Sequence, residues 1–358
     1  MSQSEANPDD GRWFDNLENK KERQLEMERS GIPLEIRAKR RLRSLGYRAF
    51  RTYYRSEDNE SSVYRELDFL AEKHIMSFDV PQGKQFGFQL MLLGECKRSQ
   101  AHDFFLFKIE EQEDMLAISD FPIRFLSPPL PLTITTGSLP KHYQMPFYTD
   151  RIVEVDAAKY RNPGKDNYND RVTHEACENL LNASKYFRDR YAIVYGSAMA
   201  NLREEIDDLY EAEDPTDQKT LESRTENVFL KSSDEFCKRF SFPDGILAVP
   251  FLVLDDNRYL VSATVDQQGK VAFEGQIDAA VCLYMSEHVD NFRDLLGLGP
   301  FFPVMVCKHA TLSKAVKIVE DGTTNLLGEF KQNFVEKDPM WIPKRLALEA
   351  TRLSPGKT

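Results

Sequence analysis

The stretch VYRELDFL at residues 63–70 and the stretch FGFQLMLLGECK at residues 86–97 decide how this chain folds. Both are rich in the aliphatic and aromatic residues that favour β-strands. Turn-forming residues stand between them at 81–83, with the sequence PQG. The pattern predicts an antiparallel hairpin that turns at these three residues.

Four charged side chains fix the register that we expect for this hairpin. Pairing Asp68 with Glu95 and pairing Glu66 with Lys97 both imply a turn centred within residues 81–83. Side chains alternate along a strand, so Glu66 and Asp68 share a face, as do Glu95 and Lys97. This single register predicts three carboxylates and one ammonium gathered in one cluster.

Clustered carboxylates repel each other and raise each other's pKa, and a bound cation relieves the repulsion. Oxygen ligands suit Mg²⁺ or Mn²⁺, which can activate a water and stabilise charge on a phosphate oxygen. Lys97 could position the water or neutralise the developing charge. The alternative is an exposed set of cross-strand ion pairs, with Glu66 opposite Lys97. Against this, the strand at 86–97 is apolar on both faces, as in a sheet interior, where surplus carboxylates are costly.

A helix is predicted upstream, at residues 34–47. Its apolar stripe has helical spacing, Pro33 suits its first turn and Gly46 suits its end. Glu35 lies on the inward side of this helix, where a lone carboxylate needs a partner. The stripe consists of Leu34, Ala38, Leu42 and Leu45.

These elements, in this order, resemble the PD-(D/E)xK nuclease superfamily, and within it the Mrr-like and Holliday-junction-resolvase-like branches. The resemblance covers residues 31–110 well and the remainder loosely. It implies an α/β fold with a restriction-endonuclease-like core, in which helices flank a mixed central sheet and helical insertions are added. One departure is that Leu67, not proline, precedes Asp68.

The resemblance also implies roles for the charged residues. Glu35 would hold metal-bound water, and Asp68 and Glu95 would bind Mg²⁺ or Mn²⁺ with the Cys96 carbonyl as a third ligand. Lys97 would orient the attacking water or stabilise the transition state. Glu66 is an optional second carboxylate. The implied activity is a metal-dependent nuclease that hydrolyses phosphodiester bonds, with DNA ahead of RNA, in restriction, repair or antiviral defence.

The region around the predicted helix is strongly basic, although the net charge of the chain is −11. Binding to nucleic acid depends on a local patch and not on net charge. Interleaved tyrosines, Tyr47, Tyr53 and Tyr54, could stack on bases. The alternative is a solvated basic helix face. The nucleic-acid contacts that we expect are Arg37, Arg40, Arg41, Arg43, Arg48 and Arg51.

Composition bounds the remaining possibilities. Of the 358 residues, 41% are hydrophobic and 29% charged, as in globular proteins, and no apolar run has membrane-spanning length. Five scattered cysteines without a CxxC pair favour free thiols in a cytoplasmic protein, and the first residues have no signal-peptide core. We therefore expect no membrane partner.

The chain is predicted to form an N-terminal helical arm at 1–30, one elaborated nuclease-like domain at 31–330 and a C-terminal tail at 331–358. The stretch at 103–109 either extends the sheet or starts a helix. Two helices are expected at 169–191 and 197–210. A strand at 246–254 should form a hairpin with 258–261, and further strands are expected at 279–285 and 302–307.

Two other classes of function remain open. A non-cleaving nucleic-acid-binding module would bind nucleic acid without metal, and its binding would survive replacement of Glu95 by alanine. A protein-interaction subunit of a larger complex would show no affinity for DNA when alone. The oligomeric state is open, and nucleases of the family often pair as homodimers.

Overall fold

The computed structural model describes residues 17–58, 61–80, 84–99, 102–109, 123–126, 148–156, 168–169, 171–211, 245–266, 268–284, 302–339 and 341. Residues 1–16 of the expected arm and 342–358 of the expected tail lie outside this part. The helices are α1 (Leu17–Arg29), α2 (Ile32–Ser44), α4 (Arg171–Glu211) and α7 (Leu312–Phe330), with short turns η5 (His309–Thr311) and η6 (Lys331–Val335). The strands are β1 (Arg48–Asp58), β2 (Ser61–Val80), β3 (Lys84–Lys97), β4 (His102–Lys108), β5 (Ile123–Leu126), β6 (Tyr148–Asp156), β7 (Tyr168–Asn169), β8 (Gly245–Leu254), β9 (Leu260–Val265), β10 (Val271–Gln276), β11 (Ala279–Tyr284) and β12 (Phe302–Lys308).

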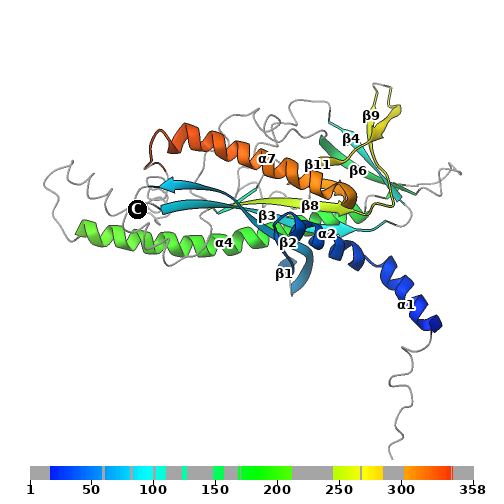
Figure 1. The fold of residues 1–358 in the computed structure, drawn as a ribbon, viewed down its shortest axis with the longest axis horizontal. Helices are drawn as coiled ribbons and strands as arrows, with labels where there is room; N and C mark the ends of the chain where they lie inside the picture. Colours follow the sequence, from blue (N-terminus) through cyan, green and yellow to red (C-terminus); the bar gives the residue numbers. More distant parts are fainter. Residues whose placement is uncertain are drawn as a thin grey trace, which may run out of the picture.

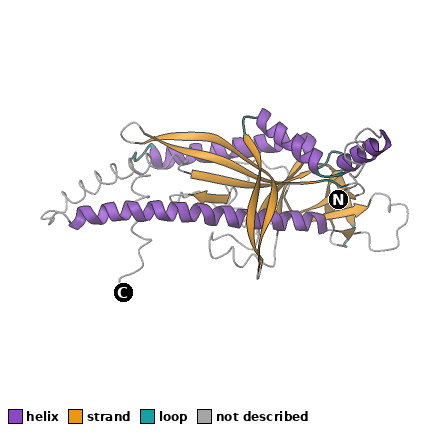
Figure 2. Cartoon of the chain, turned by 90° about the horizontal axis from the view of Figure 1, so that it is seen from below, coloured by secondary structure: helices purple, strands orange, loops and turns teal. Residues whose placement is uncertain are grey.

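All of these strands belong to one large mixed sheet, so the predicted class, a mixed α/β fold with flanking helices, is confirmed. The strand order is β1-β2-β3-β8-β12-β11-β6-β4-β9-β10, with β5 beside β8 and β7 beside β6. Helix α7 covers one face of the sheet near β3 and β8, and α4 runs along the other face (Figure 1). Figure 2 shows that α4 continues beyond the strands at one end. No helix in the described part of the chain is both long and apolar enough to cross a membrane.

Strand β3 lies inside the sheet, as its continuous apolar sequence predicts. It pairs antiparallel with β2 and parallel with β8. The β2–β3 ladder runs from Phe69–Gly94 to His74–Gln89 in the register that the sequence implied, and shifts by one residue after His74. The strands are longer than predicted: β2 reaches Val80, and β3 begins at Lys84.

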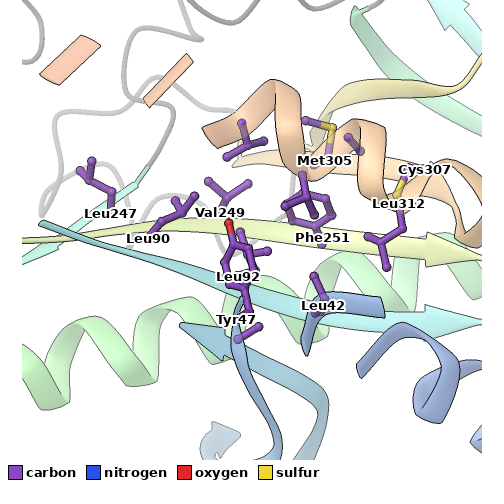
Figure 3. Close-up of a cluster of buried hydrophobic side chains, with 14 of the residues drawn as sticks. Leu42, Tyr47, Leu90, Leu92, Leu247, Val249, Phe251, Met305, Cys307 and Leu312 are labelled. Atoms are coloured by element: carbon purple, nitrogen blue, oxygen red, sulfur yellow. The ribbon is translucent and has the colours of Figure 1, made fainter. Parts of the chain in front are cut away.

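Two hydrophobic cores hold the sheet between its helices. The α2/α7 core joins both helices to one face of β2, β3 and β8, and Figure 3 shows Leu42, Leu92, Val249 and Phe251 within it. The α4 core joins the first half of α4 to the other face and includes Leu67, Leu70, Met91, Leu93, Ala176, Cys177 and Leu180. At the C-terminal end, Phe334 and Trp341 pack against the α2/α7 core.

Helix α2 ends as its sequence predicts. Gly46 has a φ of 87°, a conformation that glycine adopts readily. Its backbone amide donates to the Arg43 carbonyl, and the Tyr47 amide donates to the Leu42 carbonyl, the paired bonds of a Schellman motif. This cap turns the chain directly into β1, which brings the basic residues of both elements to one region.

Two expectations about later elements are wrong. The helices expected at 169–191 and 197–210 form the single 41-residue helix α4, which continues through Gly196. The hairpin expected between 246–254 and 258–261 does not form. Instead, β8 lies between β3 and β12, while β9 pairs with β4 and β10. The stretch at 103–109 is resolved in favour of the sheet, as β4.

Candidate functional site

A bulge in β2 places Asp68. Leu67 and Leu70 both pack into the α4 core, although strict alternation would put them on opposite faces. Asp68 and Phe69 therefore occupy the place of one residue, and the β1–β2 register shifts here, opposite Arg51. Phe69 packs into the α2/α7 core. Simple alternation, on which the single predicted cluster depended, is interrupted at the aspartate.

Three carboxylates meet on the α2 side of the bulge. One oxygen from each of Glu35, Glu66 and Asp68 lies within 4.8 Å of the other two. Two cations already contact this acidic cluster. Arg51 pairs with both Glu66 and Glu35, the latter at 3.4 Å, and Lys39 Nζ lies 3.7 Å from Glu35. The expectation that Glu35 points inward and finds partners is confirmed, since the residue is 8% exposed.

Asp68 is tied directly to β3. Its Oδ2 accepts a 2.6 Å hydrogen bond from the backbone amide of Cys96. The Cys96 carbonyl oxygen borders the same space as Glu35, because a Cβ built on Gly31 would lie 4.0 Å from that oxygen and 3.8 Å from Glu35 Oε1. Glycine at the start of α2 thus leaves open a space that a side chain would enter. Two of the predicted oxygen ligands, those of Asp68 and Cys96, lie in this region.

Glu95 and Lys97 form a second group, beside α4. Lys97 Nζ lies 2.9 Å from Glu95 Oε2, and Glu95 is 2% exposed. Within the described part of the chain, the buried oxygen Oε1 of Glu95 has no hydrogen-bond partner. The Asn179 side chain, on α4, also contacts this carboxylate. Glu95 is not one of the three mutually close carboxylates, so the predicted cluster is divided into two adjoining groups.

The two groups interact electrostatically. Burial raises the pKa of Asp68 to about 6; the Cys96 amide and Lys97 oppose the shift, while Glu35 and Glu66 add to it. Burial likewise raises the pKa of Glu95 to about 7, with Asp68 adding to the shift against Lys97. Burial works to lower the pKa of Lys97, but attraction to Glu95 and Asp68 raises it overall. Asp68 and Glu95 thus have pKa values close to neutral pH, while Lys97 stays charged.

A third set of charges lies at the end of β3. Asp255, which follows β8 and is 3% exposed, pairs with Arg37 of α2 at 3.1 Å and with Arg98 at 3.2 Å. Its backbone amide donates to the Lys97 carbonyl at 3.2 Å. Asp255 therefore holds two guanidinium groups where the end of β8 meets the end of β3.

All six arginines expected to contact nucleic acid are exposed, in α2 and β1. Arg37 and Arg51 are held by carboxylates, Arg43 donates to the Ala49 carbonyl and Arg48 lies over the Phe50 ring. Arg40 and Arg41 make no ion pair with another described residue. Of the tyrosines considered with them, Tyr47 and Tyr54 are buried, so they cannot stack on bases, whereas Tyr53 is 55% exposed.

The residues present fit a hard divalent cation. Carboxylate and carbonyl oxygens are the ligands that Mg²⁺ and Mn²⁺ prefer. A cation would give the unpartnered buried oxygen of Glu95 a partner. It would also offset the burial of Asp68 and the repulsion from Glu35 and Glu66, which together raise the pKa of Asp68. Arg51 and Lys39 already pair with carboxylates of the acidic cluster. A cation bound there would take over part of the neutralisation that these two side chains provide.

Sequence reasoning missed four residues of this region. Lys39 had a signal, because it stands one helical turn after Glu35. Asp255 had a weaker one, as an acid directly following an apolar strand. Arg98 adjoins Lys97 without a pattern of its own. Asn179 comes from α4, far away in the chain, and no local pattern could have placed it beside Glu95.

No protein-family model, no curated protein and no solved structure matches this chain. Side-chain chemistry therefore has to carry any conclusion about function.

Proposed function

We propose that this protein is a divalent-metal-dependent nuclease of the PD-(D/E)xK kind, with a restriction-endonuclease-like core, and that it hydrolyses phosphodiester bonds in DNA. The observation that carries the proposal is the contact between Asp68 and the Cys96 amide. That contact joins the acidic cluster of α2 and β2 to the Glu95–Lys97 pair on β3. A scaffold has no physical need for buried carboxylates gathered in this way.

In this proposal the metal is held by Asp68, Glu95 and the Cys96 carbonyl, with Glu35 nearby. A bound Mg²⁺ or Mn²⁺ would supply Lewis-acid stabilisation of phosphate charge and a more acidic water. Lys97, whose pKa is raised, stays protonated and neutralises charge that develops on the phosphate. Glu35 accepts a hydrogen bond from water at the site.

Basic residues would bring the substrate to this site. Arg40 and Arg41 are exposed on α2, and Asp255 fixes Arg37 and Arg98 in position at the end of β3. Guanidinium groups bind phosphates through paired hydrogen bonds, and holding them in place reduces the entropy that binding costs. The arginines supply affinity for the backbone of the nucleic acid and no base specificity.

A specific observation supports the competing class, a non-cleaving nucleic-acid-binding module. Arg51 and Lys39 already neutralise much of the acidic cluster, and Lys97 pairs with Glu95. A protein that needs no metal would balance its buried carboxylates in this manner. Such a module would bind DNA equally well in EDTA, and its binding would survive the substitution Glu95→Gln.

The test is cleavage of plasmid and of single-stranded DNA with Mg²⁺, Mn²⁺ or EDTA. Wild type should cut only with metal. Asp68→Asn, Glu95→Gln and Lys97→Met should each lower the rate by at least about a hundred-fold, as loss of one electrostatic contact commonly does. Glu274→Gln is the matched control, because Glu274 is an exposed acid on β10. Equal cutting by all variants, or DNA binding without any cutting, would reject the nuclease.

A further inference from the structure

Two large aromatic rings lie exposed on the β1–β2 hairpin. Tyr53 is 55% exposed and Tyr64 is 72% exposed. In the ladder, Tyr53 pairs with Glu66 and Tyr64 pairs with Arg55. The rings are therefore diagonal neighbours, a separation that aromatic side chains can bridge.

These rings stand on the same side of the hairpin as the acidic cluster. Residues that face each other across an antiparallel ladder share a face, so Tyr53 lies on the face of Glu66, a member of that cluster. Arg55 and Tyr64 continue the same face by alternation. The neighbouring Tyr54 points the other way, into the α4 core, where it is fully buried. The exposed row thus leads directly to Glu66.

Arginines accompany the rings, and Glu66, the carboxylate opposite Tyr53, is paired with Arg51. Arg55 is exposed within the row, and Arg51 is close enough to Tyr53 for the two groups to interact. On α2, Arg40 and Arg41 are exposed as well. Toward the hairpin tip the sequence becomes acidic, with Glu57 and Asp58, so the favourable region ends after Arg55. In Figure 1 this end of β1 projects from the body below α2.

We infer that Tyr53, Tyr64 and Arg55 form a stacking platform for unpaired nucleotides, so that single-stranded nucleic acid is the substrate class of the neighbouring site. Base–aromatic stacking tolerates any sequence, because every base has a π-face. Bases within a duplex are stacked on each other and cannot use such rings. The inference rests on the proposed nuclease function only for the fate of the bound strand, since binding to the platform needs no metal.

Binding is measured as the fluorescence anisotropy of labelled oligothymidylate in EDTA, so that no cleavage occurs. Tyr53→Ala and Tyr64→Ala should each weaken binding about five-fold or more, as loss of one stacked base does. Tyr→Phe at either position should restore binding, whereas Tyr→Leu should not. Tyr259→Ala is the matched control, because Tyr259 is also 55% exposed but precedes β9, which the sheet order places far from β1. Arg55→Gln should reduce the slope of log K against log[salt] by about 0.7, the value for one phosphate contact in a single strand.

Failure of the platform and failure of the nuclease give different results. Equal binding by wild type and the tyrosine variants, binding by Tyr→Leu as tight as by Tyr→Phe, or tighter binding of duplex than of oligothymidylate would overturn the platform. Absence of binding by wild type would do the same. Ring-dependent binding without cleavage in Mg²⁺ would leave the platform standing and reject the nuclease. Cleavage of single strands that Tyr53→Ala and Tyr64→Ala do not change would support the nuclease alone.

Discussion

The backbone amide of Cys96 donates a 2.6 Å hydrogen bond to Oδ2 of Asp68, beyond Phe69–Gly94, the pair at that end of the β2–β3 ladder. A side-chain carboxylate here takes the place of a backbone carbonyl as the acceptor. The bond favours the charged form of Asp68, against the effect of burial. This bond fixes the position of Asp68. Because an asparagine oxygen could accept the same bond, the substitution Asp68→Asn removes the charge and keeps the geometry.

Without metal, we predict that the protein loses stability as pH rises from about 5 to about 8. The pKa values of Asp68 and Glu95 are raised to about 6 and about 7, so the folded state keeps protons that the unfolded state has already released. The contribution of these two groups to stability is fully present at a pH below their pKa values in the unfolded state. It is lost as the pH rises through their higher pKa values in the folded state. The two pKa shifts together change the stability by nearly three pKa units between pH 5 and pH 8, and one unit corresponds to about 1.4 kcal/mol, so the expected loss is on the order of 4 kcal/mol.

Urea unfolding in EDTA at several pH values measures this loss. Asp68→Asn should flatten the profile, because it removes one titrating group and lowers the pKa of Glu95 toward its ordinary range. Added Mg²⁺ should stabilise wild type more at pH 8 than at pH 5.5, since the metal binds the deprotonated carboxylates. A profile that is flat for wild type in EDTA would contradict the raised pKa values.

Replacing Arg51 with glutamine should tighten binding of Mg²⁺. Arg51 contacts Glu35 and Glu66, the two carboxylates that lie beside the proposed ligand Asp68, so its positive charge opposes the binding of a cation there. We expect a several-fold lower dissociation constant in calorimetry, because an exposed ion pair of this kind contributes about 1 kcal/mol or less. Arg55→Gln, which removes a nearby cation without such contacts among the described residues, serves as the control. Weaker binding of Mg²⁺ by Arg51→Gln would place the metal outside the acidic cluster.

The substitution Gly94→Ala should destabilise the protein strongly. A Cβ on Gly94 would lie 1.8 Å from Cζ of Phe69, whose ring covers the glycine across the β2–β3 ladder. Phe69 is fully buried, so the ring cannot move aside without disturbing the α2/α7 core. Overpacking of a core commonly costs about 1–3 kcal/mol, and this overlap should reach at least the upper value. The double variant Phe69→Leu/Gly94→Ala should recover part of the loss in a urea-unfolding cycle, and strict additivity would argue against the contact.

The sequence predicted the β2–β3 register because the evidence for it is local. The turn residues at 81–83 and the two strands lie within one short stretch, and β3 is apolar on both faces. The bulge could not be foreseen from the sequence. It exists because Asp68 and Phe69 both lie opposite one residue of β1, and the sequence does not reveal how β2 pairs with β1. The prediction of one carboxylate face failed for that reason.

Long-range pairing explains the other differences. The stretch at 246–261 has the local pattern of a hairpin, but β8 pairs with β3 and β12, and β9 pairs with β4 and β10. β8 thus obtains two partners from distant parts of the chain, and β9 pairs with distant β4 on one side and with the next strand, β10, on the other. In α4, packing of the first half against the sheet fixes a helix that then continues through Gly196, where local propensity predicts a break. Asn179 reaches Glu95 through this same distant helix.

Removal of the Asp255 charge should separate stability from substrate affinity. Asp255 is buried and pairs with Arg37 and Arg98, which are partly exposed, so Asp255→Asn should cost about 1–2 kcal/mol in urea unfolding. Without this charged partner, both guanidinium groups lose their fixed positions. We expect weaker DNA binding at low salt, although the substitution makes the protein less negative. Asp266→Asn, in an exposed turn before β10, changes net charge equally and should not weaken binding. Tighter binding by Asp255→Asn would mean that net charge, and not the placement of the arginines, controls affinity.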